Sequence, residues 1–153
     1  MKNSLFLLVF LLILNSCVST KSTLQNVDDH APLPKLTSEN TFLLTTYSTD
    51  KKYGYNQDYP INVYYRDVAS AVKNEERFLN ALAGPKGEKI TYTKTGICCP
   101  FPNKRTEMGV ASLDVYVIRW EGQKSQVTLY LNAYEKGALM IPVGLTSKNN
   151  PKP

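Results

Sequence analysis

The sequence predicts an α+β domain in which one helix packs on a mainly antiparallel sheet of about five strands. Residues 113–120 (LDVYVIRW) and 125–134 (SQVTLYLNAY) alternate apolar and polar side chains with a period of two, which is typical of half-buried strands. The segment between them, residues 121–124, contains a glycine and predicts a hairpin loop. Helical spacing of apolar residues is clearest around residues 74–83.

Composition predicts the remaining strands. Three runs rich in β-branched and aromatic residues are expected to form strands, at residues 41–48, 61–65 and 89–95. Residues 51–60 (KKYGYNQDYP) predict a turn-rich loop, because they contain Gly, Asn, Asp and Pro. Pro142 interrupts the last apolar run, residues 138–145, and predicts an edge strand or a packed loop there.

Asn74 is a good N-cap, and Gly84 is expected to stop the helix. Val68, Ala71 and Val72 share the helical spacing and leave open a longer helix that begins upstream of Asn74. With Asn74 as the N-cap, Glu75 and Glu76 would lie at the positive end of the helix dipole, which explains both carboxylates without catalysis. Asp114 falls in a predicted strand, where its carboxylate can face solvent. These carboxylates therefore predict no acid–base pair.

Residues 1–16 predict a lipoprotein signal peptide. Lys2 precedes an unbroken apolar run at residues 5–14, which is too short for a spanning helix of about 20 residues. Residues 14–17 (LNSC) resemble the lipobox of bacterial lipoproteins, whose cysteine takes a diacylglycerol group and becomes the mature N-terminus. We therefore predict lipidation at Cys17, with acyl chains such as palmitate anchoring the protein to a membrane.

The predicted address is the outer membrane, with the domain facing the periplasm. Val18 follows Cys17, whereas an aspartate at that position would resemble an inner-membrane retention signal. Residues 17–40 are rich in polar residues and proline and predict a flexible tether, followed by a single domain at 41–146. Residues 147–153 predict a disordered tail.

The charge pattern favours no nucleic-acid partner. The formal net charge is +5, but the charged residues are scattered rather than clustered on a basic stretch. The membrane, contacted through the lipid, is the partner that the sequence itself predicts.

Cys98 and Cys99 leave three alternatives. They form a vicinal disulfide, remain thiols with at least one buried, or pair with another chain. A vicinal bond closes almost no chain, so it would contribute little to global stability. It would serve as a rigid turn or as a redox switch.

The sequence gives little support for a metal site, a nucleophilic cysteine, a thioredoxin-like centre or a phosphate-binding loop. The only histidine, His30, lies in the predicted tether, so neither a zinc site nor a Cys-His nucleophile pair is expected. A thioredoxin-like centre needs two residues between its cysteines. Residues 84–89 (GPKGEK) lack the spacing of a phosphate-binding loop. We predict no cofactor, metal or catalytic residue.

A binding surface is predicted instead. The chain has ten tyrosines, and tyrosine offers a large contact area with a polar tip. An aromatic-rich loop beside the CCPF stretch would suit a glycan or an envelope protein. The residues assigned to this surface are Tyr53, Tyr55, Tyr59, Pro100 and Phe101.

The domain resembles a family of small Bacteroidota lipoproteins of unestablished function. The likeness is carried by residues 53–55 (YGY), 77–82 (RFLNAL), 84–88 (GPKGE), 98–101 (CCPF), 113–116 (LDVY) and 127–132 (VTLYLN). Similar sequences are sometimes labelled 2-dehydro-3-deoxyphosphooctonate aldolase, but that enzyme is a TIM barrel, which needs about 200 residues or more. The resemblance implies a location in the cell envelope and supplies no mechanism.

The expected function is a non-catalytic binding or assembly role in the envelope. Two alternatives stay open at this point. One is an enzyme of unknown type, and the other is a thiol-redox component that uses Cys98 and Cys99.

Overall fold

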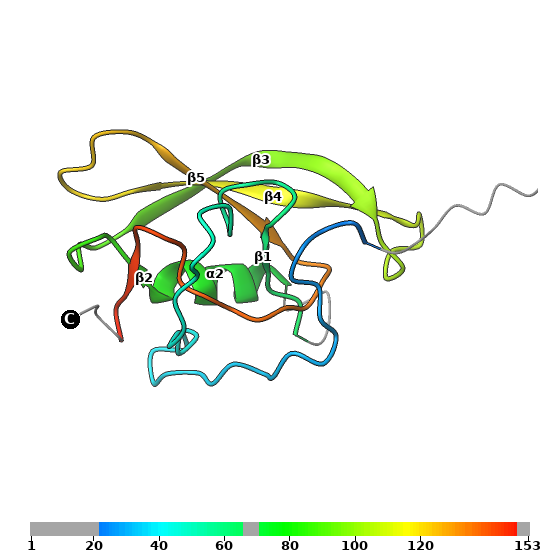
Figure 1. Cartoon of the computed structure of the whole chain (residues 1–153), viewed down its shortest axis with the longest axis horizontal. Helices are drawn as coiled ribbons and strands as arrows, with labels where there is room; N and C mark the ends of the chain where they lie inside the picture. The colour runs from blue at the N-terminus through cyan, green and yellow to red at the C-terminus, as the bar shows by residue number, and fades with distance from the viewer. Residues whose placement is uncertain (1–21, 66–70, 150–153) are drawn as a thin grey trace, which may run out of the picture.

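The computed structural model describes residues 22–65 and 71–149 (Figure 1). The predicted signal peptide and Cys17 lie outside these residues. The described helix and strands are β1 (Ile61–Asn62), α2 (Ala71–Ala81), β2 (Leu82–Ala83), β3 (Thr91–Pro102), β4 (Val110–Arg119), β5 (Val127–Asn132) and β6 (Thr146–Ser147).

The predicted α+β class is confirmed. A four-stranded sheet has the order β1-β5-β4-β3, and its β3–β4 and β4–β5 pairs are antiparallel. Strand β1 joins the other edge in parallel, with Ile61 opposite Leu131. Strands β2 and β6 form a separate antiparallel pair. The period-two segments thus form the centre of the sheet, as their alternation predicts.

The main core lies between the sheet and helix α2 (Figure 1). Phe78 and Leu79 of the helix are buried against Tyr116 and Ile118 of β4 and Leu129 of β5. A second, smaller cluster consists of Phe101, Ala111 and Leu113, where β3 ends and β4 begins. The sheet therefore carries a core at each end of its long β3–β4 hairpin.

The N-cap predicted at Asn74 is wrong, and the upstream alternative that includes Ala71 agrees with the structure. The helix begins at Ala71, so Asn74 lies in its interior and is buried. The Asn74 Nδ2 donates a hydrogen bond of 3.1 Å to the carbonyl of Val63, and its Oδ1 accepts one of 2.9 Å from Arg77. A side chain of the type that caps helices is used here to fix the helix to the chain before it.

The strand predicted at residues 41–48 is also wrong. This segment joins neither sheet and makes only isolated bridges, between Leu36 and Phe42 and between Tyr47 and Ile141. Its apolar residues have a different use, because Phe42 and Leu44 are buried in the main core while Leu43 is exposed. A β-branched and aromatic composition is therefore compatible with a segment that packs on a core without joining a sheet.

Residues 22–47, which we call the N-terminal segment, differ from the expected flexible tether at 17–40. They contain no helix or strand, yet they run along the domain, on the side of α2 away from the sheet, and contact it repeatedly (Figure 1). Ala31 is buried, and Leu24 packs against the smaller core cluster. At the other end of the chain, Ser147 is buried in β6 rather than lying in the expected tail.

Strand β3 is longer than the predicted strand at 89–95. It continues through the whole ICCPFP stretch to Pro102, with register shifts between Lys94 and Gly96 and between Cys98 and Phe101. The second shift is a β-bulge that leaves Cys99 at a positive φ of 59°. The two cysteines therefore sit on an irregular edge strand rather than in a turn.

Candidate functional site

Two adjoining cavities lie between the N-terminal segment and the body of the domain. The first has a volume of about 390 Å³, and the second of about 370 Å³. Both are lined by Leu33 and Tyr65, so together they form one depression, which we call the groove. Clefts of this size, with apolar walls and a few polar groups, are where proteins usually take ligands.

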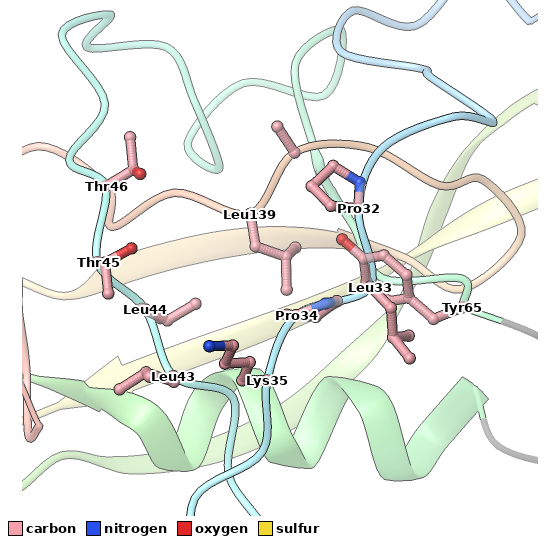
Figure 2. Close-up of a pocket in the computed structure, with 11 residues that line it drawn as sticks. Pro32, Leu33, Pro34, Lys35, Leu43, Leu44, Thr45, Thr46, Tyr65 and Leu139 are labelled. Carbon is pink, nitrogen blue, oxygen red and sulfur yellow. The ribbon is translucent and has the colours of Figure 1, made fainter.

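The first cavity is mainly apolar. Figure 2 shows Leu139 pointing between two extended stretches of the N-terminal segment, residues 32–35 and residues 43–46. The Lys35 side chain extends from the first stretch toward the second, and Tyr65 closes one end (Figure 2). This cavity therefore offers apolar contact with a single cation at its side.

The second cavity is charged. It is lined by Asp29, Tyr64, Arg105 and Lys136 as well as by the two shared residues. Arg105 forms ion pairs with Asp29 and, at 2.5 Å, with Glu135, and its guanidinium lies 5.0 Å from the centre of the Tyr64 ring. Although partial burial works against the charge, hydrogen bonds from Arg105 and Lys104 hold the pKa of Asp29 below its usual range.

Side-chain hydrogen bonds to the backbone hold the N-terminal segment against the domain. The Asn62 Nδ2 donates to the carbonyl of Asn26 at 2.8 Å, and the Asn26 Nδ2 donates to the carbonyl of Ala138 at 2.8 Å. Asn26 has a positive φ of 57°, which asparagine tolerates better than most residues. Gly137 is required at this contact, since a Cβ on it would lie 2.0 Å from the Asn26 carbonyl oxygen.

Of the three tyrosines predicted in a binding surface at residues 51–60, Tyr53 is not available. It is fully buried, and its hydroxyl accepts a hydrogen bond of 3.1 Å from the backbone N–H of Met140. Tyr59 is half-buried and packs edge-on against Tyr53, with ring centres 5.3 Å apart. Tyr55 is half-buried as well, and its hydroxyl donates to the carbonyl of Val143 at 2.8 Å. The hydroxyls of Tyr53 and Tyr55 therefore hold residues 138–143 in place.

The structure joins Cys98 and Cys99 in a vicinal disulfide, one of the three alternatives that the sequence leaves open. The Sγ of Cys99 lies 3.0 Å from Oε1 of Gln57, so the bulge and the loop at 51–60 are neighbours, as predicted. Phe101 is buried in the smaller core cluster, whereas Pro100 is exposed. Of the five residues assigned to the surface, Tyr53 and Phe101 are therefore withdrawn.

A buried carboxyl cluster lies outside the groove. Glu75 is 0% exposed, and its Oε2 accepts a hydrogen bond of 2.8 Å from the hydroxyl of Tyr116. Its Oε1 is buried and receives no hydrogen bond from the described residues. Burial, followed by the negative charge of Asp114, raises the pKa of Glu75 well above its usual range. Asp114 is paired with Lys94 at 2.5 Å, so Glu75 is the carboxyl that carries the proton.

This cluster corrects the sequence interpretation of both carboxylates. Glu75 lies one turn inside a longer helix rather than at its end, and Asp114 faces the helix rather than solvent. Neither residue lines the groove. The cluster therefore holds the helix on the sheet, and a ligand bound in the groove would not contact it.

The groove could not be predicted from the residues that form it. Asp29, Arg105 and Glu135 are separated by 76 and 30 positions along the chain, and none belongs to a recognisable motif. The one available signal is the pair of opposite-charge doublets, Asp28-Asp29 and Lys104-Arg105. Pairing them requires knowing that the N-terminal segment folds back on the domain.

The described residues contain neither a cluster of metal ligands nor a membrane-spanning helix. No group of three His, Cys, Asp or Glu side chains there could hold a metal ion. Nor does that part of the chain contain a helix with the length and hydropathy needed to cross a bilayer. Comparison with protein-family models, with curated proteins and with solved structures finds no match.

Proposed function

We propose that this chain is an outer-membrane lipoprotein, anchored through Cys17 and facing the periplasm, that binds a polypeptide partner without transforming it. The observation that carries the binding role is the groove shared by Leu33 and Tyr65. The lipobox-like residues 14–17 support the anchor.

The chemistry of the groove favours a polypeptide with apolar and acidic side chains. Apolar contact is available along Leu33, Leu43 and Leu139 in the first cavity. A cation is available at Lys35 in the first cavity. In the second cavity Lys136 donates to the carbonyl of Asp29 and lies over the Tyr65 ring, so its charge is not offset by a carboxylate, whereas Arg105 is held by two. Apolar anchors with a charged rim are typical of protein interfaces.

A glycan suits the geometry less well. The proposal of a glycan partner depends on exposed aromatic faces in residues 51–60. Tyr53 is buried, and the hydroxyl of Tyr55 is bound to the backbone of Val143. A catalytic role is likewise less favoured, because the carboxyl with the raised pKa, Glu75, lies away from the groove.

Photo-crosslinking in the native membrane tests the binding role. A photoreactive amino acid at Leu33, which is exposed and lines both cavities, is expected to form a crosslink to a polypeptide. The same amino acid at Thr93, which is exposed on β3, is the control. Adding Lys136→Glu should reduce the Leu33 product, because it reverses a charge in the groove. Identical products from both positions would contradict the proposal.

The anchor needs a separate test. Palmitate labelling of the full chain should be lost in Cys17→Ala while the domain remains folded, since Cys17 lies outside the described domain. Labelling that survives the substitution would show that another residue carries the lipid or that Cys17 is not the anchor.

A further inference from the structure

The distance between the proposed lipid and the domain is short. Because residues 22–47 pack on the domain, only the chain from Cys17 to Ser22 separates the lipid from the described structure. Five residues span at most about 18 Å even when fully extended. The domain therefore has far less freedom than a tether of residues 17–40 would allow.

The described chain begins beside one end of the β3–β4 hairpin. Figure 1 shows its first residues, in blue, next to the turn that joins β3 to β4. Leu24 packs in the cluster of Phe101 and Ala111 at that end, and Asp29 is ion-paired with Lys104 in the turn. We call residues 97–110, from the end of β3 to the start of β4, the hairpin end.

The hairpin end exposes large apolar side chains. Met108 is 87% exposed, Ile97 is 70% exposed and Val110 is 48% exposed. Pro100 is exposed as well, beside the disulfide. Met108 and Val110 lie at the tip of the hairpin, whereas Ile97, opposite Asp114, is about 13 Å farther along the sheet. Exposed apolar side chains at one end of a hairpin favour contact with a protein or a membrane.

Charge does not supply the attraction at this end. Lys104 and Arg105 are offset by Asp29 and Glu135, to which they are paired, and Glu107 is exposed next to Met108. Any contact made here would therefore depend on apolar side chains entering the boundary between headgroups and acyl chains, as interfacial segments do. An uncharged lipid surface is sufficient for that.

We propose that the hairpin end docks on the bilayer, so that Met108 and Val110 enter the lipid surface and the β4–β5 turn points away from it. The proposal rests on the anchor at Cys17. Strand β4 has ten residues, so the β4–β5 turn is about 30 Å farther along the sheet. The short chain after Cys17 holds the hairpin end, and not the opposite turn, near the lipid.

Fluorescence quenching by bromine-labelled lipids tests the docking. The lipidated full chain is placed in vesicles of phosphatidylcholine brominated on its acyl chains. An indole introduced by Met108→Trp is expected to be strongly quenched. Trp120, the only native tryptophan, follows the far end of β4. Its fluorescence in the unsubstituted protein gives the background that is subtracted from each variant. Lys124→Trp, in the exposed β4–β5 turn, is the matched control and should be quenched little.

Flotation of the vesicles separates the proposal of a lipid anchor at Cys17 from the proposal that the hairpin end docks on the bilayer. Protein that floats without quenching of the indole at position 108 would overturn the docking and leave the anchor intact. Equal quenching at positions 108 and 124 would overturn the orientation. If a photoreactive amino acid at position 108 instead forms a crosslink to another protein chain in the native membrane, the hairpin end contacts a protein rather than lipid. Protein that does not float would overturn the anchor and the docking together.

Discussion

Glu75 is the residue whose environment differs most from what its sequence context suggests. It is a carboxylic acid enclosed between helix and sheet, with the hydroxyl of Tyr116 on one oxygen and Asp114 near the other. Protonated, it can donate to Asp114, which is ion-paired with Lys94. Ionised, it would be a buried charge beside a second carboxylate. The folded state therefore depends on a proton that the unfolded chain does not retain at neutral pH.

This leads to a prediction about pH. Burial and the charge of Asp114 raise the pKa of Glu75 to about 8, whereas in the unfolded chain it titrates near its ordinary value. The free energy of unfolding should fall between these two pKa values as pH rises, by about 1.4 kcal/mol per pH unit while only the unfolded form is ionised. Below both values the contribution is fully present.

Glu75→Gln should remove this part of the pH dependence and stabilise the protein above pH 7. Its amide can accept from Tyr116 and donate to Asp114, and it needs no proton. Denaturant unfolding between pH 4.5 and 9 measures the effect. Glu76→Gln, at the exposed neighbouring position, is the control and should keep the slope of the unsubstituted protein. A parallel pH profile in Glu75→Gln would contradict the assignment of the proton.

Cys99 combines a disulfide with a left-handed backbone. Its φ of 59° costs about 1–2 kcal/mol for a residue with a Cβ, and glycine avoids that cost. The vicinal bond closes almost no chain, so its removal should change stability little. The β-bulge rather than the sulfur bond would then hold the conformation.

A pair of variants separates these contributions. Cys98→Ala with Cys99→Ala keeps the left-handed strain of the oxidised protein and should unfold at nearly the same denaturant concentration. Cys98→Ala with Cys99→Gly relieves that strain and should be more stable than the alanine variant by roughly 1 kcal/mol. Equal stability of the two variants would show that residue 99 leaves the left-handed region once the disulfide is absent.

At the scale of elements, a segment can be predicted from the sequence only where its surroundings impose a pattern on its residues. The strands at 113–120 and 125–134 are predictable because each has one face in a core, which imposes period two on the sequence. Residues 41–48 have a strand-like composition but join neither sheet. The N-terminal segment shows no periodicity, since single bonds at Asn26 and Asn62 hold it, and such bonds leave no pattern. The groove cannot be predicted from the sequence for the same reason, because the contacts that form it leave no periodic pattern.

Gly137 gives a direct test of how the N-terminal segment is held. In Gly137→Ala the new Cβ would lie 2.0 Å from the backbone oxygen of Asn26, so the segment must move away. We expect a loss of about 2 kcal/mol or more in stability and faster proteolysis within residues 22–31. Gly96→Ala is the control, because its Cβ would meet nothing within 4 Å. Intact resistance to proteolysis in Gly137→Ala would contradict this packing.

At the scale of the whole molecule, one segment links the proposed binding and the proposed anchoring. Residues 22–47 form a wall of the groove through Leu33 and Lys35, and their first residues lie at the hairpin end. A partner that fills the groove would contact the same segment that the lipid holds. Under the two proposals, groove and membrane therefore lie on adjoining parts of the domain, and the orientation of one fixes that of the other.

The length of the chain after Cys17 should accordingly control the orientation. Inserting about 20 Gly and Ser residues between Lys21 and Ser22 adds a flexible reach of about 25 Å. Flotation with vesicles should not change, but quenching of the indole introduced by Met108→Trp should fall toward that of Lys124→Trp. The same insert after Asn149, at the other end of the described chain, is the control and should leave quenching unchanged. Full quenching with the long linker would show that Met108 and Val110 dock without help from the short chain, which would contradict the role assigned to it.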